Sequence, residues 1–195
     1  MGLASLLSAL RQKFLFLLNG LAVGLHKVGL TPNSSTVLGL VFGAAAGLVF
    51  FLGASDVWIF IVAPFLVLVS GFFDAVDGSL ARLHGETKFG GILDSTFDRF
   101  SEIFVLSGVI LGGLASPFWG LTAISASLMV SYVRARVEVE GLKMMGIGFA
   151  ERPERLLIFV IASFLRNIEY GVIVIAVLSV LTVFQRMLYA YRRLG

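Results

Sequence analysis

The sequence predicts an all-α integral membrane protein with six transmembrane helices and an N-terminal amphipathic helix at the cytoplasmic interface. Of its 195 residues, 58% are hydrophobic and 14% are charged, whereas soluble domains carry about 25% charged residues. Several apolar runs reach the roughly 20 residues that a helix needs to cross a bilayer. The charged residues lie in short segments between these runs, so the net charge of +3 does not indicate nucleic-acid binding. Because the chain has no cysteine, disulfides and thiolate chemistry are excluded.

Residues 1–30 precede the first predicted span and form a separate piece. Ser5, Ser8, Arg11 and Gln12 fall on one face at helical spacing, with Leu and Phe elsewhere. This pattern is typical of a helix that lies in the membrane interface. The alternative is a signal peptide whose apolar region is 14–25, but no small-residue cleavage site follows it.

The six predicted spans form one bundle over residues 34–192, so the chain 1–195 is expected to be a single membrane domain. The spans begin and end at Ser34–Ser55, Val57–Arg82, Phe89–Leu114, Phe118–Glu140, Pro153–Leu165 and Tyr170–Tyr191. Pro32 marks the first break because proline lacks an N–H and restricts its predecessor. Pro153 suits a first helical turn. The fifth span has a short charge-free core, 156–165, and the turn 166–169 follows it.

Glycine spacing and charge placement indicate how these spans pack and are oriented. Gly39, Gly43 and Gly47 recur every four residues and allow another backbone to approach, either within the bundle or in a dimer. With six spans, every Lys and Arg except Arg166 falls on the side of both termini. That side is therefore predicted to be cytoplasmic.

Four aspartates form two pairs at the cytoplasmic ends of the second and third spans. Asp74 and Asp77 are three residues apart, and Asp94 and Asp98 are four apart. Each spacing places the pair on one helix face. Carboxylates that meet across a helix hairpin repel one another unless a cation lies among them, and all-oxygen ligands favour Mg²⁺, Mn²⁺ or Ca²⁺. Helix capping or pairing with arginines is the plainer alternative, but acids within a membrane are costly and usually functional.

Glycines and an arginine lie between the two aspartate pairs. Gly78 and Gly85 would let a phosphate approach the backbone. Arg82, one turn beyond Gly78, could hold that phosphate. Together with the acids, these residues predict a metal-dependent diphosphate site.

The run Asp74-Ala-Val-Asp77-Gly78-Ser-Leu-Ala-Arg82, followed by Gly90, Asp94 and Asp98, resembles the signature of the CDP-alcohol phosphatidyltransferases. The family pattern has eight residues between its arginine and second glycine, and seven precede Gly90 here, so the connecting loop is one residue shorter. The family core also has six spans and a cytoplasmic interfacial helix, so the resemblance covers the whole chain.

The resemblance implies residue roles and a homodimer. Asp98 would be the catalytic general base. Two ions, Mg²⁺ or Mn²⁺, would be held by Asp74, Asp77, Asp94 and Asp98. The CDP-lipid would be bound by Asn33, Ser34, Ser35, Thr36, Gly78, Arg82 and Thr87.

A second basic cluster follows in the last three spans. Arg186 lies inside the sixth span, where a buried arginine needs an anion. The segments 131–138 and 151–156, read with the motif above, resemble the phosphatidylinositol-phosphate synthase branch and its archaetidylinositol-phosphate relatives. That branch uses inositol phosphate, and guanidinium groups suit phosphate dianions. The resemblance therefore implies an acceptor phosphate site made by Arg134, Arg152, Arg155 and Arg186. The branch usually has Lys where Arg134 stands, and loop charges of the positive-inside kind are the alternative.

The implied reaction is transfer of a lipid phosphate from CDP-diacylglycerol or CDP-archaeol to inositol phosphate by direct attack, with release of CMP. The same reaction with glycerol 3-phosphate or serine stays open, and the arginines alone do not exclude glycerol 3-phosphate because it is also an anion. A divalent-cation transporter is an alternative of another class. It would distribute its acids along the membrane depth rather than crowd them at one interface.

Overall fold

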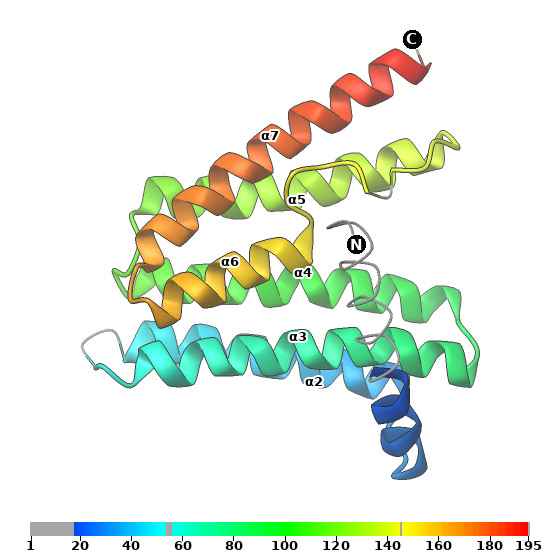
Figure 1. The fold of residues 1–195 in the computed structure, drawn as a ribbon, viewed down its shortest axis with the longest axis horizontal. Helices are drawn as coiled ribbons and strands as arrows, with labels where there is room; N and C mark the ends of the chain where they lie inside the picture. Colours follow the sequence, from blue (N-terminus) through cyan, green and yellow to red (C-terminus); the bar gives the residue numbers. More distant parts are fainter. Residues whose placement is uncertain (1–17, 54–55, 145, 195) are drawn as a thin grey trace, which may run out of the picture. The chain divides into compact units, whose positions relative to one another are not determined.

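The computed structural model describes residues 18–53, 56–144 and 146–194, and the regular elements among them are all α-helices. Residues 18–27 are helical, while the predicted polar face at Ser5, Ser8, Arg11 and Gln12 lies outside the described residues. The helices that follow, drawn in Figure 1, are α2 (Pro32–Leu52), α3 (Ile59–His84), α4 (Lys88–Leu111), α5 (Pro117–Val139), α6 (Arg152–Phe164) and α7 (Ile168–Leu194).

Proline and polar residues set several helix starts. Pro117 stands in the first turn of α5, and the side chain of Ser116 caps that helix by accepting from the Trp119 N–H at 3.5 Å. Proline also stands in the first turn of α6, as the sequence predicts. Arg166 has a φ of 58° in the turn from α6 to α7, a left-handed conformation that allows the abrupt reversal visible in Figure 1.

Three helices, α2, α3 and α7, are long and apolar enough to cross a membrane. α4 and α5 have 24 and 23 residues but include charged residues toward one end. α6 has only 13 residues, a length of about 20 Å at about 1.5 Å per residue. It is thus shorter than the hydrocarbon core of roughly 30 Å. The three long apolar helices support the prediction of a membrane protein. The presence of six complete spans stays a prediction.

The chain divides into two compact units. Unit 1 comprises Met1–Phe42 and Val69–Ser101, and unit 2 comprises Gly43–Leu68 and Glu102–Gly195. Helices α2, α3 and α4 each have residues in both units.

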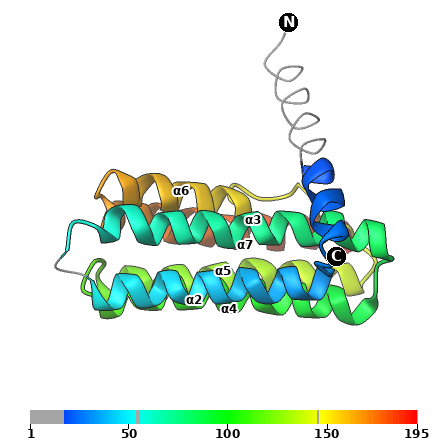
Figure 2. The ribbon, with the colours of Figure 1, turned by 90° about the horizontal axis from the view of Figure 1, so that it is seen from below.

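Small polar side chains fasten the helices of unit 1. Ser70 Oγ donates to the Gly39 carbonyl at 2.7 Å and lies 3.1 Å from Ser101 Oγ. Ser35 Oγ donates to the Phe73 carbonyl at 2.9 Å. These bonds hold α2 against α3 directly beside Asp74. Figure 2 shows the short connection that joins α3 to α4.

The helical segment 18–27 packs on the end of α3. Leu18 and Ala22 are buried in one cluster with Val76 and Leu80. At its end, His26 Nδ1 lies 3.1 Å from His84 Nε2.

Unit 2 has a continuous apolar core from α2, α3, α4, α5, α6 and α7, with Phe50, Val109 and Val172 fully buried. A Cβ added at Gly47 would overlap the Phe104 carbonyl, and one at Gly108 would overlap Gly47. Gly39 in unit 1 likewise lies against the Ser70 carbonyl. Gly39 and Gly47 of the predicted glycine face therefore pack against other helices of the same chain.

Candidate active site

Three of the four predicted metal-binding aspartates converge in unit 1. Asp74 of α3 and Asp94 and Asp98 of α4 each offer a carboxylate oxygen, and these oxygens all lie within 4.8 Å of one another. Gly85 makes the hairpin possible because its φ of +94° suits a residue without a Cβ. Helical spacing and a short loop thus bring together acids that are up to 24 positions apart in the chain.

The donor set fits a hard divalent cation. Carboxylate oxygens are the ligands that Mg²⁺ and Mn²⁺ prefer, and all three aspartates are partly accessible. Asp98 also lies 3.6 Å from the Arg99 guanidinium. This chain could therefore hold a metal ion between α3 and α4.

The fourth aspartate, Asp77, is not in that group. It is only 5% exposed, and its Oδ2 accepts a hydrogen bond from Thr36 Oγ1 at 2.8 Å. Thr36, which the resemblance assigns to the CDP-lipid, therefore orients an aspartate.

A cavity of about 420 Å³ lies within unit 1, next to the acidic cluster. It is enclosed by the start of α2, the end of α3 and the start of α4, and both Asp77 and Asp94 reach it. Five of the seven residues predicted to bind the CDP-lipid line it: Asn33, Thr36, Gly78, Arg82 and Thr87.

The other two predicted residues are engaged elsewhere. Ser35 is fully buried and bonded to α3. The Ser34 hydroxyl accepts from the Thr31 N–H at 2.9 Å in a local capping contact. Thr87 lines the cavity, but its hydroxyl caps α4 by accepting from the Gly90 N–H at 3.0 Å. Local helix-capping chemistry accounts for the Ser34 and Thr87 hydroxyls, whereas the Ser35 hydroxyl joins α2 to α3.

The predicted acceptor arginines lie in unit 2, and Arg155 is fully paired there. Its Nε and Nη2 donate to the two carboxylate oxygens of Glu102 at 2.8 and 2.9 Å. A further bond runs from Nη1 to the Ala150 carbonyl at 3.3 Å. The side chain is 3% exposed. This bidentate geometry ties the start of α6 to α4.

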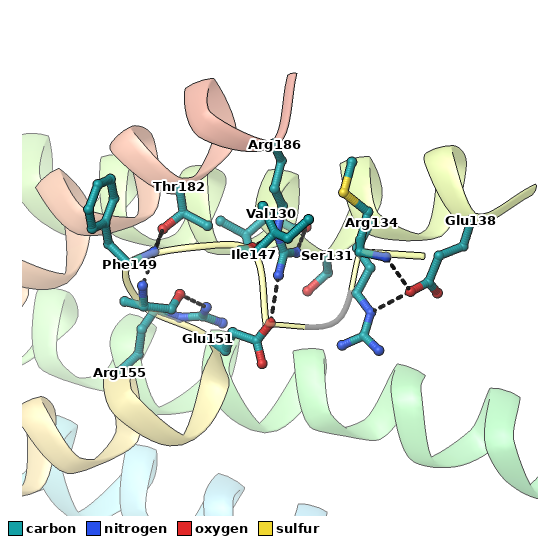
Figure 3. A network of polar contacts seen from close by, with 12 residues as sticks. Val130, Ser131, Arg134, Glu138, Ile147, Phe149, Glu151, Arg155, Thr182 and Arg186 are labelled. Carbon is teal, nitrogen blue, oxygen red and sulfur yellow. Dashed lines mark hydrogen bonds and ion pairs between the residues drawn. The ribbon is translucent and has the colours of Figure 1, made fainter. Parts of the chain in front are cut away.

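Arg186 projects from α7 into the network of Figure 3 and is 2% exposed. It donates to the Ile147 and Val130 carbonyls, both at 2.7 Å, and to Glu151 Oε1 at 3.0 Å. The sequence predicts that a buried arginine here needs an anion, and in this structure Glu151 is that anion.

The other two arginines lie nearer solvent. Arg134 Nε donates to Glu138 Oε1 at 3.1 Å, one turn along α5 (Figure 3). Arg152 is half-buried at the start of α6. Arg134, Arg155 and Arg186 thus each pair with a carboxylate of this chain.

Comparison with known proteins identifies the family. The CDP-alcohol phosphatidyltransferase family matches residues 29–184. The chain belongs to the CDP-alcohol phosphatidyltransferase family.

Named relatives of this CDP-alcohol phosphatidyltransferase match it over nearly all of its length. It is 40% identical to the archaetidylinositol phosphate synthase of Pyrococcus horikoshii, over 97% of this chain and 98% of that one. It is 33% identical to the phosphatidylinositol phosphate synthase of Mycobacterium tuberculosis, over 91% and 87% of the two chains.

Solved structures agree with that assignment. The crystal structure of the Mycobacterium tuberculosis synthase with CDP-DAG bound matches with a TM-score of 0.77 and 32% identity, over 89% of this chain and 93% of that one. The same synthase in complex with manganese and citrate matches with a TM-score of 0.76 and 32% identity, over 89% and 88%.

The sequence did not predict that two glutamates of this CDP-alcohol phosphatidyltransferase pair with buried arginines. Glu102 is an acid in an apolar stretch of α4, and that rarity alone could have marked it. Glu151 adjoins Arg152 in a charged loop and gave no comparable signal, because its partner is 35 positions away.

Proposed function

We propose that this membrane transferase moves a lipid phosphate from a CDP-lipid to inositol phosphate and releases CMP. The observation that carries the proposal is the convergence of Asp74, Asp94 and Asp98 beside a cavity that Arg82 lines. The activities named for its relatives, archaetidylinositol phosphate and phosphatidylinositol phosphate synthesis, support the acceptor.

The acidic cluster would hold the metal. Asp74, Asp94 and Asp98 offer the converging oxygens, and Asp77 would complete the set for a second ion. A related synthase in complex with manganese supports this choice of cation. When bound, the ions neutralise the charge of the diphosphate.

The CDP-lipid would occupy the cavity of unit 1, and a related structure with CDP-DAG bound supports a ligand of this class. Arg82 would hold a phosphate, with Asn33, Gly78 and the neighbouring backbone around the nucleotide. Asp98 would accept the proton of the acceptor hydroxyl. The hydroxyl oxygen then attacks the lipid-side phosphorus, and CMP leaves without a covalent enzyme intermediate.

The acceptor phosphate would be held in unit 2 by Arg134, Arg152 and Arg186. Arg155, which the sequence also assigns to the phosphate, would fix the start of α6, because both Glu102 oxygens are bonded to it.

We also propose a membrane topology and an oligomeric state for this protein. Residues 1–195 would form one membrane domain with six spans, and the sharing of α2, α3 and α4 by both units supports this. The active site and both termini would face the cytoplasm, by the distribution of Lys and Arg. The protein would act as a homodimer.

An acceptor panel tests the proposed function. Purified protein would be mixed with CDP-archaeol or CDP-diacylglycerol, Mg²⁺ and one of three acceptors: inositol phosphate, glycerol 3-phosphate or serine. We expect CMP release that depends on inositol phosphate. Release with glycerol 3-phosphate or serine alone would reassign the acceptor. A divalent-cation transporter would release none.

A further inference from the structure

Arg186 has hydrogen-bond acceptors of two kinds, and they differ in how readily a ligand could replace them. The Ile147 and Val130 carbonyls belong to the backbone, so displacing them would require the chain to move. The third acceptor is a single oxygen of the Glu151 side chain, at 3.0 Å. Rotation about its side-chain bonds is enough to withdraw it.

Glu151 is also the exposed member of the pair. Its side chain is 32% exposed, whereas that of Arg186 is 2% exposed. Figure 3 shows Glu151 on the side of the guanidinium away from α7. An anion arriving from solvent would therefore meet Glu151 before it met Arg186.

The carboxylate of Glu151 does not cap the helix that Glu151 begins. Glu151 is the N-cap residue of α6, where short polar side chains normally accept from the first N–H groups. Its side chain makes no capping hydrogen bond. The carboxylate is directed at Arg186 instead.

The Arg155–Glu102 pair provides the contrast. Both carboxylate oxygens of Glu102 are bonded there, and its side chain is only 18% exposed. Breaking such a bidentate buried pair leaves an uncompensated charge in the protein interior. Of these two buried arginines, only Arg186 has a partner suited to exchange.

We propose that Glu151 is a resident anion on Arg186, which the phosphate of the acceptor displaces. The inference rests on the proposed function, since it concerns the acceptor of that reaction. In the free enzyme, Glu151 prevents a buried cation from standing unpaired. A phosphate monoester displaces it because it carries about two charges and three acceptor oxygens, whereas a neutral polyol offers nothing that outcompetes a carboxylate. Glu151 thereby restricts the acceptor to phosphorylated alcohols.

Neutralising Glu151 tests the proposal. The full-length Glu151→Gln protein in detergent would be titrated with inorganic phosphate by calorimetry. Because the ion pair with Arg186 becomes a hydrogen bond to a neutral amide, we expect phosphate to bind about five- to tenfold more tightly. The KM for inositol phosphate should fall by the same factor, while the kcat and the KM for the CDP-lipid stay within about twofold.

Two further variants separate displacement from a general charge effect. Glu140→Gln makes the same charge change at a glutamate that pairs with the exposed Arg136, and should leave phosphate binding unchanged. Glu151→Asp keeps the charge but favours capping of α6, so its carboxylate leaves Arg186. We expect phosphate to bind about two- to fivefold more tightly, since the competing ion pair is lost.

The outcomes are distinct. Tighter phosphate binding in both Glu151 variants supports the proposal, and Glu151→Asp decides it if Glu151→Gln does not fold. Binding equal to or weaker than wild type, or an equal gain in Glu140→Gln, would overturn it. If the wild type releases no CMP with inositol phosphate, the proposed function fails, yet the phosphate titrations still decide the role of Glu151.

Discussion

The ion pair between Arg155 and Glu102 gives a stability prediction whose size follows from the contacts. Replacing Arg155 by Met removes three donated hydrogen bonds and leaves the Glu102 carboxylate without its bidentate partner. The side chains are 3% and 18% exposed, so solvent compensates little. Breaking a buried pair on one side costs about 3–5 kcal/mol. For a chain of this length, the unfolding temperature should fall by about 6–20 °C.

Thermal unfolding in detergent, combined with a double-mutant cycle, measures this effect. The Arg155→Met and Glu102→Gln double variant should be more stable than the sum of the single changes predicts, because neither charge is then left alone. Arg136→Met, at an exposed pair with Glu140, should change the stability by less than about 1 kcal/mol. An Arg155→Met protein that unfolds at the wild-type temperature but no longer binds phosphate would contradict the structural role of Arg155 and return it to the acceptor site.

Three further predictions concern the site and the helix packing. Thr36→Val removes the donor to Asp77 and should raise the Mn²⁺ concentration for half-maximal activity about 10-fold, by analogy with outer-shell metal partners. Thr96→Val, at an exposed position, is the control. The same Mn²⁺ dependence of activity in both variants would contradict the positioning role of Thr36. Asp98→Asn should fold but lower CMP release at least about 10²-fold, and retained activity would remove Asp98 as the base. Gly108→Ala, whose Cβ would overlap the backbone of α2, should cost about 1–3 kcal/mol of stability, whereas the unobstructed Gly24→Ala should cost none.

The helices could be predicted from the sequence because their signals are local. Apolar runs gave the order of the elements, and Pro153 gave the start of α6. The convergence of Asp74 with Asp94 and Asp98 was also predictable, since helical spacing and a short loop leave few other arrangements. The bounds of α6 were predicted to within one residue, but whether it crosses the membrane was not, because an apolar run shows where a helix is buried and not whether it spans the bilayer.

Partner choice was not predictable, because it depends on contacts between distant segments. The sequence predicts an anion for Arg186 but cannot distinguish a ligand phosphate from Glu151. It likewise groups Thr36 with substrate-binding residues, whereas its hydroxyl bonds Asp77, 41 positions away. In both cases the residue type indicated a polar partner, but the sequence did not show which group that partner is.

Manganese binding shows whether the converging aspartates hold a metal ion. The full-length protein in detergent would be titrated with Mn²⁺, and the free ion measured by electron paramagnetic resonance, for the wild type and for Asp94→Asn. We predict saturable binding by the wild type that Asp94→Asn weakens at least about 10-fold, since a metal-binding carboxylate is lost. Identical titration curves for the two proteins would contradict the assignment of the converging aspartates as the metal site.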